Sequence, residues 1–257
     1  MRQIVDYSEI SKLVTTHMKK GVLTNNFMRP EEYRAEISAG TLYAHKYNGG
    51  LLLLRKREGR HLLTFYINDR EVLPDIELPP DTVTGIPQKP ASAGEAVAYW
   101  TRFGMSPLGD YIRLVREAGS VLVSEESTVH IASESDFDGI HALLHDCFDL
   151  RTGCLPSAAE LRDDIKCGMV LCIKDNGIGG VLRFGEFSGR AEILHLAVRE
   201  DLRGRRVGHA LVGAFIARYN EKKCTVWMRE GYAPALKIYT TAGFSPDGMR
   251  STLLGYE

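Results

Sequence analysis

The sequence predicts a mixed α/β fold made of two similar halves. At 257 residues the chain exceeds the length of about 100 to 200 residues at which single cores usually stop growing. Hydrophobic spacing alternates between strand and helix periods, and in the second half the order is two helices, three strands, helix, strand, helix, strand. Strands that follow one another directly are expected to be antiparallel, and the helical crossover after the third strand implies one parallel pair. Each half should therefore hold a mixed, mostly antiparallel central sheet flanked by helices.

The composition is that of an ordinary soluble globular protein, with 44% hydrophobic and 25% charged residues. The net charge is −1 and basic residues are spread along the chain, which argues against nucleic acid and anionic membranes as partners. The longest apolar run, residues 51–54, is far below the roughly 20 residues of a membrane span, and no leader pattern opens the chain, so we expect a cytoplasmic protein. Five cysteines without a Cys-x-x-Cys pair predict reduced thiols and no metal site.

The first half shows a hairpin followed by a proline-rich connection. Strands are predicted at residues 40–45, 51–55 and 61–67, with Asn48, Gly49 and Gly50 supplying the first turn. Residues 74–93 carry five prolines and are predicted to be a loop. A helix is predicted at residues 93–103.

The second half begins with a short strand at residue 129 and a capping signal at Ser133, whose first turn is acidic. The elements that follow are helices at 133–148 and 157–166, strands at 169–174, 179–187 and 191–198, a helix at 207–219, a strand at 224–229, a helix at 233–242 and a strand at 251–255. A glycine- and arginine-rich turn separates the third long strand from the helix at 207–219. This order is the basis of the predicted parallel crossover.

An internal repeat supports two halves, because residues 96–111 recur as residues 235–250. The identical positions are Ala96 and Ala235, Thr101 and Thr240, Gly104 and Gly243, Ser106 and Ser245, Pro107 and Pro246, and Gly109 and Gly248. Chance similarity between two helix-to-strand junctions is the alternative, but similarity at a long fixed offset favours duplication. We predict domains at residues 1–125 and 126–257.

The most informative segment is the turn at residues 203–206, Arg-Gly-Arg-Arg, which joins an apolar strand to a helix that begins near Val207. The first amides of a helix and its dipole bind phosphate, and the arginines add positive charge. Gly208 and Ala210 are expected to leave room for a pyrophosphate. The alternative is a solvated basic turn before an amphipathic helix.

The second half resembles the GNAT superfamily of acetyltransferases over residues 128–257. The family's cofactor motif is matched by Arg205, Gly208 and Ala210, and its preceding strand ends in residues like Leu196, Ala197 and Val198. Its second signature is matched by Pro234, Ala235, Tyr239, Gly243 and Phe244. One departure is Tyr232, which stands where the family commonly has an asparagine that contacts the cofactor.

The resemblance implies acetyl-CoA as the co-substrate. It places the pyrophosphate on the backbone of Arg203, Gly204, Arg205, Arg206, Val207, Gly208, His209 and Ala210. Backbone groups of Leu196, Ala197 and Val198 would pair with the pantetheine arm like an added strand, and an N–H near Val198 would polarise the thioester carbonyl. The chain is then expected to be an N-acetyltransferase that acts on a primary amine of a small molecule or amino acid, as a monomer or homodimer.

Amine acetylation requires a base, because an alkyl ammonium has a pKa near 10.4. Glu192 resembles the catalytic glutamate of the histone-acetylating members; its alternative is a carboxylate paired with a residue such as Arg183. His195 is a second candidate base, although strand alternation predicts that it faces away from Glu192. Tyr239 matches the family position that protonates the departing thiolate.

The first half lacks these features at the equivalent positions, where Trp100 replaces Tyr239, Met105 replaces Phe244 and no glycine-rich turn occurs. It is expected to share the fold without a cofactor site. Two other functions remain open. One is a non-catalytic acyl-CoA-binding sensor, and the other is a tRNA-dependent aminoacyl transferase, which the intact motif and the lack of a basic face disfavour.

Overall fold

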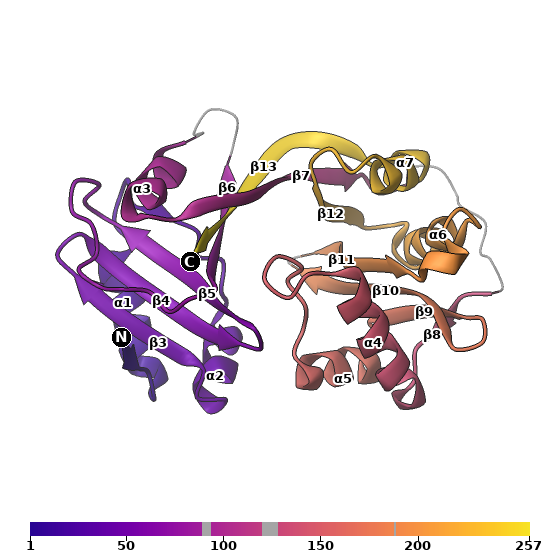
Figure 1. Ribbon diagram of the computed structural model, residues 1–257, viewed down its shortest axis with the longest axis horizontal. Coiled ribbons are helices and arrows are strands. Elements are labelled where there is room, and N and C mark those ends of the chain that lie inside the picture. Colours follow the sequence, from indigo (N-terminus) through magenta and orange to yellow (C-terminus); the bar gives the residue numbers. More distant parts are fainter. Residues whose placement is uncertain (89–93, 120–127, 188) are drawn as a thin grey trace. The chain divides into compact units, whose positions relative to one another are not determined.

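The computed structural model describes residues 1–88, 94–119, 128–187 and 189–257, which form two compact units (Figure 1). The first unit contains Met1–Asp110 and Arg250–Glu257, and the second contains Tyr111–Met249. The predicted boundary between residues 125 and 126 falls outside the described residues. The chain instead passes between units within two long strands, β7 (Ser106–Arg116) and β13 (Ser245–Tyr256).

The first unit has a sheet with helices on both faces. Its elements are β1 (Arg2–Gln3), α1 (Tyr7–His17), β2 (Leu23–Thr24), α2 (Pro30–Ser38), β3 (Leu42–Tyr47), β4 (Gly50–Arg57), β5 (Arg60–Ile67), β6 (Thr82–Gln88) and α3 (Glu95–Phe103). The sheet order is β1-β3-β4-β5-β6-β13, and β2 adds to β5. Side chains of α1 and α2 pack on one face, and Tyr99 and Trp100 of α3 pack on the other.

The three predicted strands of this unit are confirmed, but the predicted loop at residues 74–93 is partly wrong. Residues 82–88 form β6, in which Val83 and Ile86 are buried despite Pro87. Residues 89–93, which include the predicted start of the helix, lie outside the described residues. Helices α1 and α2 were not predicted.

The second unit repeats this arrangement. Its elements are β8 (His130–Ile131), α4 (Phe137–Cys147), α5 (Ala158–Lys166), β9 (Val170–Lys174), β10 (Ile178–Phe187), β11 (Arg190–Val198), α6 (Val207–Tyr219), β12 (Lys223–Arg229) and α7 (Ala233–Thr241). The sheet order is β7-β12-β11-β10-β9-β8, with α4 and α5 on one face and α6 and α7 on the other. The predicted elements are confirmed, including the parallel pairing of β11 with β12.

The sequence repeat corresponds to a structural repeat, because α3 leads into β7 as α7 leads into β13. Each helix is followed by a glycine with positive φ, 109° at Gly104 and 85° at Gly243. The amide of the next residue donates to the carbonyl of Trp100 in the first case (2.9 Å) and of Tyr239 in the second (3.0 Å). This is the helix-ending geometry in which glycine is favoured.

The last strand of each half takes part in the sheet of the other unit. Residues 250–256 of β13 pair antiparallel with β6 in the first unit. Residues 111–116 of β7 pair antiparallel with β12 in the second unit. This exchange of strands was not predicted.

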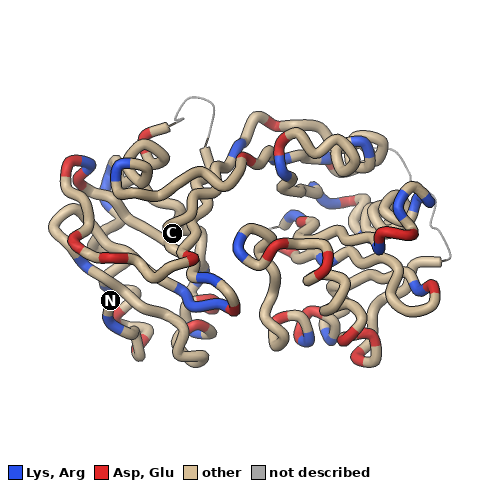
Figure 2. Tube along the Cα trace, in the orientation of Figure 1, with Lys and Arg blue, Asp and Glu red and all other residues tan. Residues whose placement is uncertain are grey.

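Charged residues of both signs are interspersed along the trace within each unit (Figure 2). Among the described residues, no helix combines the length and apolar character needed to span a membrane.

Candidate active site

The strands β11 and β12 part in the middle of the second unit. Their parallel register runs from Arg190 opposite Lys223 to Ile193 opposite Val226 and goes no further. Strand β11 nevertheless continues to Val198, held on its other side by β10. Residues 194–198 therefore pair with β10 along one edge, whereas their other edge is not paired with β12.

A β-bulge lies at the point where the strands part. Arg183 and Phe184 are adjacent on β10, but they pair with His195 and Ile193, so Leu194 is the extra residue on β11. The bulge reverses the alternation of side chains, since Ile193 and Leu196 both pack into the core under α6 and α7. His195 consequently lies on the same face as Glu192, and the prediction that they face opposite ways is wrong.

The backbone direction on the open edge follows from the pairing with β10. The amide of Arg199 donates to the carbonyl of Gly179 at 2.9 Å, so Ala197, two residues earlier, also turns its backbone toward β10. Leu196 and Val198 turn theirs the other way. The Val198 carbonyl accepts a long hydrogen bond from Arg203 Nε at 3.4 Å. Two of the three predicted pantetheine residues thus present backbone groups to the open edge.

The N-terminus of α6 follows this edge after residues 199–206, of which Glu200–Leu202 form a short 3-10 helix. Arg206 is its N-cap in the left-handed region (φ 65°), and the first helical hydrogen bond runs from the Ala210 amide to the Arg206 carbonyl at 3.0 Å. The amides of Val207, Gly208 and His209 precede that bond, so the helix itself does not use them. Residues 203–206 are exposed. Unused amides, a helix dipole and exposed guanidinium groups together favour an anion.

Packing, rather than space for a ligand, accounts for the two small residues of the motif. A Cβ on Gly208 would lie 2.9 Å from Ile238 Cδ1 of α7, so glycine allows the two helices to approach. Ala210 is 4% exposed and belongs to the core. The space beside the Cα atoms of Gly208 and Ala210 is therefore filled by the packed protein, so the prediction that these residues leave room there for a pyrophosphate is not supported.

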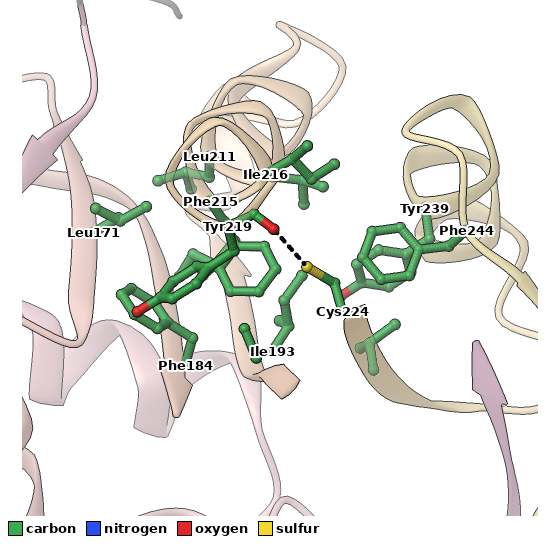
Figure 3. Close-up of a cluster of buried hydrophobic side chains, with 14 of the residues drawn as sticks. Leu171, Phe184, Ile193, Leu211, Phe215, Ile216, Tyr219, Cys224, Tyr239 and Phe244 are labelled. Atoms are coloured by element: carbon green, nitrogen blue, oxygen red, sulfur yellow. Dashed lines mark hydrogen bonds between the residues drawn. The ribbon is translucent and has the colours of Figure 1, made fainter. Parts of the chain in front are cut away.

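Tyr239 lies at the edge of the core under α6 and α7, beside Phe244 (Figure 3). The two rings meet edge to face with their centroids 5.7 Å apart, and Tyr239 is 4% exposed. Within the described part of the chain, its phenol makes no hydrogen bond to another residue. Burial raises the pKa of Tyr239, so the phenol keeps its proton at neutral pH.

Glu192 is held against the sheet by two neighbours. Its carboxylate accepts a hydrogen bond from Thr225 Oγ1 at 2.9 Å and lies 3.4 Å from Arg190 Nη2. Arg183, the partner suggested as an alternative, instead pairs with Asp164 on α5 at 2.6 Å. The Glu192 side chain is 14% exposed, so it is positioned but still reachable.

Both ring nitrogens of His195 are engaged. Nε2 lies 2.9 Å from the Gly153 carbonyl, which can only accept, so Nε2 carries a proton. Nδ1 faces Arg183 Nη1 at 3.5 Å, and the ring packs edge-on against Phe148. His195 therefore ties the loop between α4 and α5 to β11. In the described ranges, no three His, Cys, Asp or Glu side chains are grouped to hold a metal ion.

The pairing of the strands places further residues on the side of the sheet that carries Glu192. These residues were not predicted from the sequence. Thr225, Trp227 and Arg229 alternate with the buried Cys224, Val226 and Met228 of β12, and Tyr111 of β7 pairs with Arg229. Burial raises the pKa of Tyr111, and the nearby Cys154 thiol adds to this. The alternation in 224–229 was a usable signal for the β12 residues. Nothing local indicated Tyr111, because its strand comes from the other half of the chain.

Comparison with known families matches residues 130–244 to the acetyltransferase (GNAT) family. This range contains every candidate residue from Glu192 to Tyr239. Residues 130–244 of the chain are therefore a domain of the GNAT acetyltransferase family. No curated protein matches the sequence.

Solved structures show that the fold extends over the whole chain. A GCN5-related N-acetyltransferase from Sphaerobacter thermophilus is 14% identical, with a TM-score of 0.60 over 100% of this chain and 94% of that one. A GNAT-family acetyltransferase from Colwellia psychrerythraea is 10% identical, with a TM-score of 0.58 over 100% and 99%. A tandem GNAT protein from the clavulanic acid biosynthesis pathway is 12% identical, with a TM-score of 0.53 over 84% and 83%. At these identities the likeness shows a shared fold.

Proposed function

We propose that the chain is an acetyl-CoA-dependent N-acetyltransferase that acetylates a primary amine of a small molecule or amino acid. The observation that carries the proposal is the open edge of β11 followed by the N-terminus of α6. A thioester of coenzyme A joins an amide-containing arm to a diphosphate, so its binding calls for both an unpaired strand edge and an anion site. The GNAT family match over the same residues supports this assignment.

In this proposal the diphosphate is held by the amides of Val207, Gly208 and His209. The exposed side chains of Arg203, Arg205 and Arg206, set on a turn around Gly204, offset its charge. The pantetheine arm pairs with Leu196 and Val198, whose backbone groups face the open edge. A backbone N–H group of Val198 or a neighbouring residue polarises the thioester carbonyl.

The proton transfers are assigned to Glu192 and Tyr239. The acceptor ammonium gives a proton to Glu192, directly or through a water, and the neutral nitrogen attacks the thioester carbon. As the carbon–sulfur bond breaks, the sulfur receives a proton from Tyr239, and the second proton of the nitrogen passes through water to the tyrosine oxygen, which restores the phenol. The Tyr239 phenol suits this role, because it makes no hydrogen bond to another described residue and its proton can therefore be donated to the sulfur. His195 is assigned a positioning role instead, since both of its nitrogens are engaged.

The first unit is proposed to lack a cofactor site of its own. Between β5 and β6, residues 68–81 contain no helix, so nothing there corresponds to the N-terminus of α6.

The test is an acyl-transfer assay that follows free thiol from acetyl-CoA with a panel of amines, amino acids and aminosugars. For each amine the matched alcohol serves as the control. Thiol release that needs the amine, with the N-acetyl product identified by mass, supports the proposal. Acetyl-CoA binding without turnover on any amine would favour a non-catalytic sensor.

A further inference from the structure

The first unit contains a fork that corresponds to the one in the second unit. Strands β5 and β6 are parallel and pair only at His61 opposite Thr82 and Leu62 opposite Val83. Strand β5 then continues to Ile67. In the sheet orders of the two units, β5 and β6 occupy the places of β11 and β12. Residues 63–67 are thus the counterpart of the open edge at residues 194–198.

In the first unit this edge is occupied by the chain itself. Strand β4 pairs with β5 along its whole length, from Gly50 opposite Ile67 to Arg57 opposite Arg60. The short strand β2 also pairs with β5, with Leu23 opposite Ile67 and Thr24 opposite Tyr66. Because β4 fills one edge, β2 lies on the other, the edge that β6 has left.

Asn25 then bridges the two separating strands. Its Nδ2 donates to the carbonyls of Leu63 on β5 (3.1 Å) and Gly85 on β6 (3.0 Å), and its Oδ1 accepts from the Phe65 amide (3.0 Å). Thr24 Oγ1 donates to the Phe65 carbonyl at 2.6 Å. The backbone groups that an extended ligand would pair with are therefore already bonded.

The neighbouring side chains also close the site. Trp100, which takes the place of Tyr239, is fully buried, with ring centroids 5.3 Å from Phe65 and 5.4 Å from Phe103. Where the second unit presents the Tyr239 phenol, the first presents an aromatic cluster around Trp100, whose buried Nε1 has no hydrogen-bond partner among the described residues.

We infer that residues 23–26 are a built-in substitute for the acyl-donor arm, which fills the fork of the first unit and limits the chain to one acetyl-CoA, bound in the second unit. Residues 23–26 supply the interactions that a pantetheine arm would supply. They pair like a strand with the edge of β5, and the Asn25 side-chain amide bridges β5 and β6. The inference rests on the proposed function for the identity of the ligand. The filling of the fork by the chain stands on the hydrogen bonds alone.

The first experiment measures the filled fork without any ligand. Amide hydrogen exchange is followed at Phe65 in the full chain, in Asn25→Ala and in Asn48→Ala, an exposed turn asparagine that serves as the matched control. Loss of the bond to Asn25 should speed exchange at Phe65 by about tenfold, the equivalent of one hydrogen bond, and the control should not. If Asn25→Ala does not fold, Thr24→Val removes the hydroxyl bond to the Phe65 carbonyl together with the bond that the Asn26 amide donates to the same hydroxyl. Equal exchange rates at Phe65 in the parent, the Asn25 variant and the control would overturn the inference.

The second experiment measures binding by calorimetry and by amide chemical shifts. One acetyl-CoA per chain should bind, with shifts at Leu196, Val198 and residues 207–209 and none at Phe65. Two acetyl-CoA per chain, or shifts at Phe65 comparable to those at Val198, would contradict the inference. If no acetyl-CoA binds while Phe65 stays protected, the proposed function fails and the filled fork is upheld.

Discussion

Gly208 of α6 lies so close to Ile238 of α7 that a Cβ on residue 208 would come within 2.9 Å of Ile238 Cδ1. This contact positions the start of α6, whose first amides are the proposed anion site. The side chain of Val207 is seated in the same way, because a Cβ on Gly180 of β10 would lie 2.5 Å from Val207 Cγ1. The helix N-terminus is thus positioned by glycines on both sides.

The contact predicts a specific coupling between residues 208 and 238. Gly208→Ala gains helix propensity but forces the end of Ile238 to move, which costs about 1 to 3 kcal/mol in a packed site. Ile238→Val removes the atom that clashes. Urea unfolding of both single variants and the double variant should show a favourable coupling of about 1 kcal/mol, and strict additivity would contradict the contact.

Tyr239→Phe should slow turnover without destabilising the fold. The phenol has no partner among the described residues, so its removal should leave the melting temperature unchanged or slightly higher. Loss of the proton donor should lower kcat by about 10² or more, while acetyl-CoA affinity changes little. Phe244→Leu, which perturbs the adjacent ring, is the control for packing. A fall in stability with kcat intact would remove Tyr239 from the reaction.

The two candidate bases should respond differently to conservative changes. Glu192→Gln keeps an acceptor for Thr225 but cannot take a proton, so kcat should fall by about 10² or more. His195→Gln can still donate to the Gly153 carbonyl, so it should keep most of the rate. A large loss of rate with His195→Gln alone, at unchanged stability, would reverse the assignment.

The Asp136 carboxylate at the start of α4 should stabilise the fold near neutral pH and lose this effect in acid. Burial by itself would raise the pKa of Asp136, but hydrogen bonds from Lys174 and Ser133 outweigh it and hold the pKa below its ordinary value. The pKa of Asp136 is lower in the folded state than in the unfolded state. Its contribution to stability is therefore complete above the unfolded-state pKa of about 3.9, and it is lost as the pH falls through the folded-state pKa. Asp136→Asn should therefore lower the urea midpoint near neutral pH and matter less as the solution is acidified. The exposed Asp138→Asn is the control, and a pH-independent effect of Asp136→Asn would contradict this account.

Local patterns predicted the second unit well. The helix at residues 207–219 has the predicted bounds, and the repeated glycines 104 and 243 end their helices through the same backbone bonds. These features depend on residues close in sequence. The position of the turn at residues 203–206 also follows from local signals, because a strand, this turn and a helix follow one another in the sequence.

Features that depend on distant contacts were not predictable from those patterns. The exchange of β7 and β13 is a long-range pairing that leaves no local trace, and with it Tyr111 was missed. The bulge at Leu194 changes the face of His195, although the sequence alternation across residues 191–198 looks regular. Gly208 was predicted to leave side-chain space for a pyrophosphate, because nothing local indicated that Ile238 of another helix fills that space. Strand β6 was obscured by Pro87, whose effect on pairing depends on its partner strand.

The most direct test of the central claim is a calorimetric titration with acetyl-CoA. The variant is Arg205→Glu with Arg206→Glu, and the matched control is Lys19→Glu with Lys20→Glu, an equal change of charge at exposed positions of the first unit. We expect the parent and the control to bind one acetyl-CoA with similar affinity and the arginine variant to bind at least about tenfold more weakly, because charge-assisted contacts are lost. Absence of binding to the parent, or equal affinity of all three proteins, would contradict the assignment of the α6 N-terminus as the diphosphate site.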